Sequence, residues 1–206
     1  MEKKVLITIA RQCGSGGREI GKRVSELLGI PLYDRELIVG AAEAGELHPE
    51  VAERVDEKAA NSLLYTLAMG AGLHSTYAGM AHMPVNDRLF MHQSDYIRAR
   101  AEEGSGVFVG RCADYVLRDD PARFSVFIYA PTEARCARVM AREGGMKEGA
   151  ALDLINKTDR RRATYYGFYT GGKWGKYDNY HLALDSDALG IDGVAELIAA
   201  AVKKRG

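Results

Sequence analysis

The segment with the clearest capacity for chemistry is a glycine-rich turn near the start of the chain. An apolar run at residues 5–9 leads into it, and a helical pattern that continues through Leu28 follows it. Glycines let a backbone place successive N–H groups around an anion, and the positive end of the next helix adds its dipole. We therefore predict a turn that binds nucleotide phosphates. Its phosphate-binding residues are Arg11, Gly14, Ser15, Gly16, Gly17 and Arg18.

This turn departs from the usual P-loop, which reads G-x-x-x-x-G-K-[ST] and places the lysine on the terminal phosphates and the hydroxyl on magnesium. When Gly16 is taken as the second glycine, Arg11 stands at the first glycine, Gly17 at the lysine and Arg18 at the hydroxyl residue. Either Arg18 or Arg11 can supply the missing charge. The alternative is an ordinary glycine-rich connection between a strand and a helix.

Three consecutive arginines, Arg160, Arg161 and Arg162, form a second candidate. A phosphoryl group in transfer spreads negative charge over its oxygens, and guanidinium groups are bidentate donors with permanent charge. Arginines on a segment that closes over a site also exclude water. The alternative is a solvated helix face on which Asp159 and Glu148 pair with these arginines.

Predicted buried strands alternate with helices along the chain, and polar candidates follow the strands. Asp34 ends one strand and Arg111 ends another. This alternation predicts an α/β fold with a mainly parallel sheet covered on both faces, whose ligands gather beyond the carboxyl ends of the strands. After the first helix, the predicted elements are a strand at residues 29–34, helices at 35–43 and 86–103, and strands at 106–111, 124–130 and 180–186.

The length, charge balance and cysteine content of the chain limit the kinds of protein and of binding partner that are expected. The 206 residues suit one domain, and 28 acidic residues balance 28 basic ones, so net charge calls for neither a nucleic-acid nor a membrane partner. Cys13, Cys112 and Cys136 are an odd number at wide spacings, which favours a reducing compartment over a disulfide scaffold or a zinc site. The apolar N-terminal run is too short for a signal peptide. We expect a soluble, cytoplasmic protein.

The motifs and their order resemble the cytidylate kinase-like branch of the P-loop nucleoside monophosphate kinases. The segments that carry the resemblance are residues 10–21, 32–38, 109–115, 127–135 and 184–186. The resemblance implies a single kinase domain over residues 1–206 with a three-layer parallel-sheet core. It also implies a helical monophosphate-binding lobe at about residues 40–100 and an arginine-bearing lid at about residues 142–176.

The resemblance further implies ATP with Mg²⁺ as the donor and a nucleoside monophosphate as the acceptor, with CMP or dCMP favoured. Arg18 or Arg11 is then expected to do the work of the usual lysine, and Ser15 to reach Mg²⁺ through water. The catalytic residues are expected to be Arg18 together with the lid arginines Arg160, Arg161 and Arg162.

The expected acceptor-binding residues are Asp34, Arg35 and Arg111, and this part of the chain departs from the family pattern twice. Cys112 stands where the family has an aspartate after the arginine, and Arg35 and Glu36 replace a Ser-Gly sequence. Two other interpretations stay open. One is a P-loop kinase with a different small-molecule acceptor, because the residues after Asp34 differ. The other is a nucleotide-binding regulatory module without turnover, because the usual P-loop lysine is missing.

The stretch at residues 165–175 is rich in aromatic residues and glycine and is longer than the corresponding part of ordinary cytidylate kinases. Its aromatic faces could stack a base. A role in packing or in a subunit contact is favoured. Small-molecule nucleotides are the expected partners, and a homodimer is left open.

Overall fold

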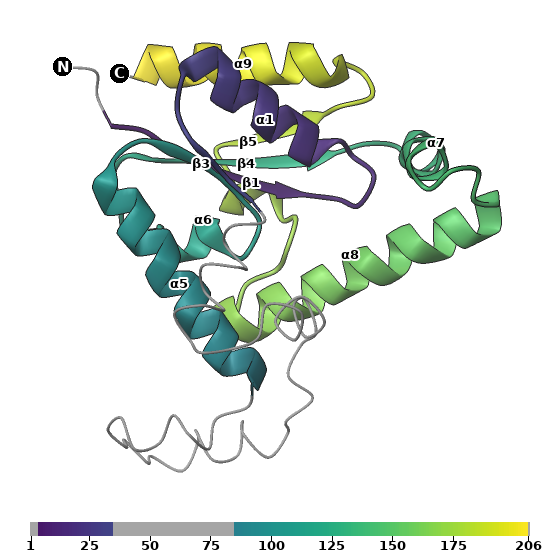
Figure 1. The fold of residues 1–206 in the computed structure, drawn as a ribbon, viewed down its shortest axis with the longest axis horizontal. Helices are drawn as coiled ribbons and strands as arrows, with labels where there is room; N and C mark the ends of the chain where they lie inside the picture. Colours follow the sequence, from purple (N-terminus) through teal and green to yellow (C-terminus); the bar gives the residue numbers. More distant parts are fainter. Residues whose placement is uncertain (1–3, 35–84, 206) are drawn as a thin grey trace.

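The fold is built on a parallel sheet (Figure 1), and the computed structural model describes residues 4–34 and 85–205. In these ranges the sheet has five strands in the order β2-β3-β1-β4-β5, and each neighbouring pair runs parallel. The predicted α/β fold with a mainly parallel sheet is confirmed. The strands are β1 (Leu6–Arg11), β2 (Leu32–Tyr33), β3 (Gly106–Val109), β4 (Arg123–Tyr129) and β5 (Leu182–Asp185).

Helices cover both faces of the sheet. Figure 1 shows α1 (Gly17–Leu28) and α9 (Gly190–Arg205) on one face. The opposite face carries α5 (Val85–Glu103), α6 (Ala113–Val116) and α8 (Glu148–Thr170). The remaining elements of the described residues are α7 (Thr132–Arg142), which follows β4, and the short 3₁₀ helix η2 (Tyr177–Asn179) before β5. The helix predicted at residues 86–103 is confirmed.

Strand β1 lies at the centre of the sheet and is buried from both sides. Because side chains alternate along a strand, Ile7 and Ile9 pack with Ile20 of α1, whereas Leu6 packs with Ile97 of α5. Each of these side chains is almost fully buried. The carboxyl end of β1, where the glycine-rich turn begins, is thus fixed by two hydrophobic clusters.

The strand predicted at residues 106–111 is shorter than expected, because β3 ends at Val109. The next three residues, Gly110, Arg111 and Cys112, have φ values of 82°, 55° and 53°. Left-handed residues cannot continue a strand. We call residues 110–112 the β3 turn.

The segment predicted to be a lid contains one continuous helix. Helix α8 includes all three consecutive arginines and reaches into the aromatic stretch. Its C-terminal part packs against α5, where the rings of Phe90 and Tyr169 stack with centroids 4.0 Å apart. Tyr165 and Tyr166 are buried in the same aromatic cluster. The first part of the aromatic stretch therefore has the packing role that its sequence favours.

Several sequence predictions fall outside the described residues. They are the helix at residues 35–43, most of the predicted monophosphate-binding lobe, and Arg35. Within the described residues, no helix combines the length and the apolar character that crossing a bilayer requires.

Candidate functional site

The glycine loop, residues 12–16, joins β1 to α1 and contains two residues with positive φ. Gly14 has a φ of 77° and Gly16 of 75°, both in the left-handed region that favours glycine. A Cβ on Gly14 would also lie 2.6 Å from the carbonyl oxygen of Arg135. Within the described residues, no side chain caps the start of α1. The N–H groups of its first turn therefore remain available to an anion.

A carboxylate from α8 clamps the glycine loop. The Cys13 N–H donates to Asp159 Oδ1 at 2.7 Å, and Arg135 Nη1 of α7 donates to Asp159 Oδ2 at 2.6 Å. Burial raises the pKa of Asp159, while the Cys13 N–H and the charges of Arg135 and Arg162 oppose that rise. The sequence alternative pairs Asp159 with its neighbouring arginines. In the structure Asp159 forms an ion pair with Arg135, and of those neighbours Arg162 acts on it through its charge.

A second set of contacts holds the far side of the loop. Ser186, just after β5, donates from Oγ to the Ser15 carbonyl at 2.6 Å, and Arg138 Nη2 donates to the Ser186 carbonyl at 3.0 Å. The Ser15 side chain is fully buried, and its hydroxyl donates to the Gln12 carbonyl at 2.9 Å. Ser15 therefore stabilises the loop from inside, and this geometry does not favour the magnesium contact expected of it.

The loop forms one wall of a cavity of about 500 Å³. The start of α1, Asp34 at the end of β2, and α7 complete the lining. Arg18 Nε pairs with Asp34 Oδ2 at 2.6 Å across this cavity, while the Arg18 side chain remains 68% exposed. Cationic side chains dominate the polar lining. The arginines that contribute to it are Arg11, Arg18, Arg138, Arg142 and Arg162.

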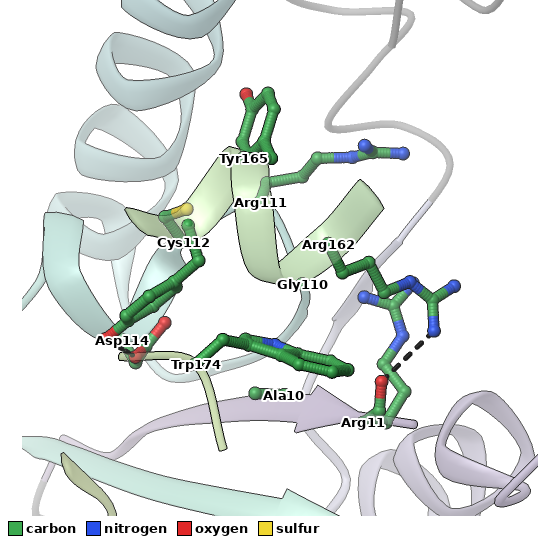
Figure 2. A pocket seen from close by; sticks show the side chains of 10 residues that line it. Ala10, Arg11, Gly110, Arg111, Cys112, Asp114, Arg162, Tyr165 and Trp174 are labelled. Atoms are coloured by element: carbon green, nitrogen blue, oxygen red, sulfur yellow. Dashed lines mark hydrogen bonds between the residues drawn. The ribbon is translucent and has the colours of Figure 1, made fainter. Parts of the chain in front are cut away.

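A second, smaller cavity of about 40 Å³ lies between the ends of β1 and β3 and helix α8 (Figure 2). Arg111 of the β3 turn lines it, as do Tyr165 and Trp174. Arg11 and Arg162 line both cavities, and Arg162 Nη1 donates to the Arg11 carbonyl at 3.0 Å. Figure 2 shows this bond as the dashed line. These two arginines therefore mark the junction of the cavities.

The smaller cavity also contains a buried carboxyl group. Asp114 is 6% exposed, and its Oδ2 accepts a hydrogen bond from the Tyr166 hydroxyl at 2.8 Å. Burial raises the pKa of Asp114, and the hydrogen bond from Tyr166 opposes that rise. Burial also raises the pKa of Cys112, so this thiol stays protonated at neutral pH. Position 112 thus lacks the carboxyl that the resemblance implies, but Asp114 brings another to the same cavity.

The three consecutive arginines do not line the two cavities as a group. Arg162 reaches both cavities, whereas Arg160 and Arg161 line neither of these two cavities in the described part of the chain. Arg160 is exposed, and Arg161 Nε donates to the Lys157 carbonyl of its own helix. Consecutive helical residues point about 100° apart, which follows from 3.6 residues per turn. The predicted catalytic roles of Arg160 and Arg161 therefore lack support from this geometry.

Other sequence-predicted residues do meet at this edge of the sheet. The glycine loop, Asp34 and Arg111 follow β1, β2 and β3 and surround the two cavities, as the parallel arrangement predicts. The sequence analysis missed several residues that position the loop. These are Gln12, Arg135, Arg138, Asp159 in its clamping role, and Ser186.

The sheet order and the glycine loop between β1 and α1 define a P-loop kinase fold. Shikimate kinase from Bacteroides thetaiotaomicron has this fold, with a TM-score of 0.53 and 14% sequence identity over 98% of each chain. An uncharacterised protein from Eubacterium ventriosum is more similar. Its TM-score is 0.73 and its identity 27%, over 98% of this chain and 100% of that one.

The chain belongs to the cytidylate kinase-like family, whose profile matches residues 6–188. A cytidylate kinase from Pyrococcus horikoshii is 23% identical over 211 aligned residues, which cover 97% of this chain and 88% of that protein. Family membership and fold together support a kinase that transfers a phosphoryl group to a nucleotide or another small molecule.

Proposed function

We propose that this protein transfers the terminal phosphate of ATP to a nucleoside monophosphate, with CMP or dCMP as the favoured acceptor. The observation that carries the proposal is the junction of the two cavities at Arg11 and Arg162. Phosphoryl transfer needs the attacking and leaving oxygens in line and little covalent help from the protein. Guanidinium groups where the two cavities adjoin would supply the charge and would bring the donor and acceptor phosphates together.

On the donor side, the larger cavity receives the phosphates of ATP. The N–H groups of the glycine loop and of the first turn of α1 bind them, and Arg138 and Arg142 offset their charge. Asp159 and Ser186 hold the loop in place before ATP arrives. Donors that are already oriented need no reorganisation during the reaction, which is the main source of electrostatic catalysis.

On the acceptor side, Arg111 binds the phosphate of the monophosphate, and Arg162 contacts the group in transfer. Asp34 follows β2, which pairs with β3, and its carboxylate lines the larger cavity. Asp34 remains our proposed acceptor contact, and Arg35, which lies outside the described residues, is proposed on its sequence position alone. Arg18 supports this arrangement by pairing with Asp34.

Mg²⁺ accompanies ATP in this proposal, and the larger cavity contains ligands that suit it. The carboxylates of Glu19 and Asp34 line this cavity. Mg²⁺ prefers oxygen ligands and in kinases takes one or two carboxylates together with substrate phosphates. Because Asp34 is already paired with Arg18, Glu19 would hold the ion, which supplies charge neutralisation when it is bound.

The first test is an acceptor screen with Mg-ATP in a coupled assay of ADP release. The acceptors are CMP, dCMP, UMP, AMP and shikimate, and ATP binding is measured separately by calorimetry. We expect the highest kcat/KM with CMP or dCMP. Turnover of another acceptor would contradict CMP and dCMP as the favoured acceptors. Cys112 in place of an aspartate is the observation that favours a different acceptor. ATP binding without any turnover would indicate a regulatory module.

A second test compares neighbouring arginines of α8. Because only Arg162 of this pair lines the two described cavities, Arg162→Ala should lower kcat about a hundredfold, as expected when one donor to the transition state is lost. Arg161→Ala should change kcat less than about threefold, since its guanidinium donates to its own helix. Equal losses in both variants would contradict the role given to Arg162.

A further inference from the structure

The glycine loop has exchanged two residues relative to the usual P-loop. Gly17 stands where that motif has its lysine, and Arg11 stands where it has its first glycine. Gly17 is the first residue of α1, and it is not among the described residues with positive φ. Its backbone therefore does not require glycine, so the reason for a glycine here must lie in the space around it.

Arg11 occupies that space. A Cβ on Gly17 would lie 2.5 Å from Arg11 Cβ and 2.7 Å from Arg11 Cγ, closer than real side chains approach. The lysine of an ordinary P-loop could not begin from position 17 while Arg11 is present. The stem of Arg11 thus lies over the position from which the lysine side chain would start.

The guanidinium of Arg11 extends from there to the β3 turn. A Cβ on Gly110 would collide with Arg11 Nη1, so Gly110 makes room for the charged end just as Gly17 makes room for the stem. Arg11 lines both cavities. Two glycines from separate turns therefore accommodate one arginine side chain at the junction of the cavities.

Arg18, the other candidate for the lysine's role, lines the larger cavity but not the smaller one. Its side chain is 68% exposed, and its Nε pairs with Asp34 beyond β2. Position 18 also follows the lysine position in the motif. These positions favour Arg11 over Arg18 for the lysine's role.

We propose that Arg11 is the phosphate-binding cation of this P-loop, transposed from the start of α1 to the end of β1, and that Gly17 is the glycine this transposition requires. The proposal rests on the proposed function, because it names the residue that contacts the transferring phosphoryl group. A guanidinium has planar, bidentate donors and permanent charge, so at the junction it can contact donor and acceptor phosphates together.

The test restores the ordinary arrangement by exchanging the two residues. Arg11→Gly and Arg11→Met each remove the charge, and Arg11→Met keeps the stem over Gly17. Both should weaken Mg-ATP binding about tenfold in calorimetry and lower kcat about a hundredfold. Gly17→Lys alone should lower the melting temperature because it collides with Arg11. The double variant Arg11→Gly/Gly17→Lys should recover at least about tenfold of the turnover lost in Arg11→Gly.

Melting temperatures and circular dichroism identify any variant that fails to fold, and Arg98→Met serves as the control, since Arg98 lies on the exposed side of α5. The proposal is overturned if Arg11→Met binds ATP as tightly as the wild type, or if the double variant is no better than Arg11→Gly. Either result leaves the proposed function intact when the wild type still turns over. A wild type that binds no ATP overturns both proposals.

Discussion

The glycine loop after β1 and the β3 turn reach the same edge of the sheet by different conformational means. The loop has glycine at both of its positive-φ positions, Gly14 and Gly16. The β3 turn has glycine only at Gly110, and Arg111 and Cys112 follow it in the same left-handed region. A non-glycine residue there costs about 1–2 kcal/mol. The β3 turn therefore contains backbone strain that the glycine loop avoids.

This difference matches what each turn presents to its cavity. The glycine loop presents backbone N–H groups, so it needs no side chains and is held from outside by residues such as Asp159 and Ser186. The β3 turn presents the side chains of Arg111 and Cys112, which both line the smaller cavity. Strain of this kind persists only where the surrounding structure enforces it, and it gathers at functional sites.

The strongest test of the external support for the glycine loop is Asp159→Ala. The Arg135 and Asp159 side chains are only 8% and 17% exposed, so the substitution leaves a buried guanidinium without its carboxylate. Removing one partner of a buried pair costs about 3 kcal/mol, measured as the free energy of unfolding in urea. Asp153→Ala, at an exposed position of the same helix, should change stability by less than about 0.5 kcal/mol. Similar values for both variants would show that Asp159 does not clamp the loop.

The glycine requirement of the loop is tested by Gly14→Ala against Gly171→Ala. Both glycines have positive φ, but only at Gly14 would the new Cβ meet a neighbour, the Arg135 carbonyl at 2.6 Å. Gly171→Ala should cost about 1 kcal/mol from backbone strain alone. Gly14→Ala should cost about 2 kcal/mol or more, because the backbone contact adds to the strain, and it should also weaken ATP binding. Thermal unfolding and calorimetry give both values, and an equal cost at the two sites would refute the steric argument.

The sequence predicts where the glycine loop and the β3 turn lie along the chain better than it predicts the residues that hold them in place. Apolar runs place β1, β3 and β4 because burial on both faces leaves a direct trace in composition. The clamp by Asp159 joins residues 146 positions apart, and it exists only because α7 and α8 return to the loop. A local pattern cannot show such a contact.

The direction in which each side chain leaves helix α8 is a second feature that a local sequence pattern does not show. Three adjacent arginines look equivalent in the sequence, yet only the phase of α8 directs Arg162 to the cavities. The left-handed conformations of Arg111 and Cys112 were also not predictable, because neither residue type favours them. The residues that escaped prediction therefore depend on tertiary placement.

The strain in the β3 turn is tested by comparing Arg111→Gly with Arg111→Ala. Both variants lack the guanidinium, so both should raise the KM for the acceptor while ATP affinity stays unchanged. They differ in the cost of a φ of 55°. The glycine variant should therefore be more stable than the alanine variant by about 1 kcal/mol in urea unfolding. Equal stability would mean that this turn is not strained.

The carboxyl group of Asp114, beside the β3 turn, adds a pH dependence to stability. Burial raises the pKa of this carboxyl above its ordinary value of 3.8, and the hydrogen bond from Tyr166 opposes the rise. The folded protein then binds the Asp114 proton more tightly than the unfolded chain does. This contribution to stability is fully present below pH 3.8 and is lost as the pH rises through the folded pKa.

Asp114→Asn should therefore flatten the fall in stability between acidic and neutral pH, measured by urea unfolding at several pH values. Asp159→Asn is the matched variant at the glycine loop, where burial also raises the pKa of the carboxyl but Arg135 pairs with it. Because a paired cation favours the charged form, Asp159→Asn should remove less of the pH dependence. If Asp159→Asn flattened the profile more than Asp114→Asn did, the burial of Asp159 would be offset less by its hydrogen bonds and nearby charges than the burial of Asp114. The expected order of the two carboxyl groups would then be reversed.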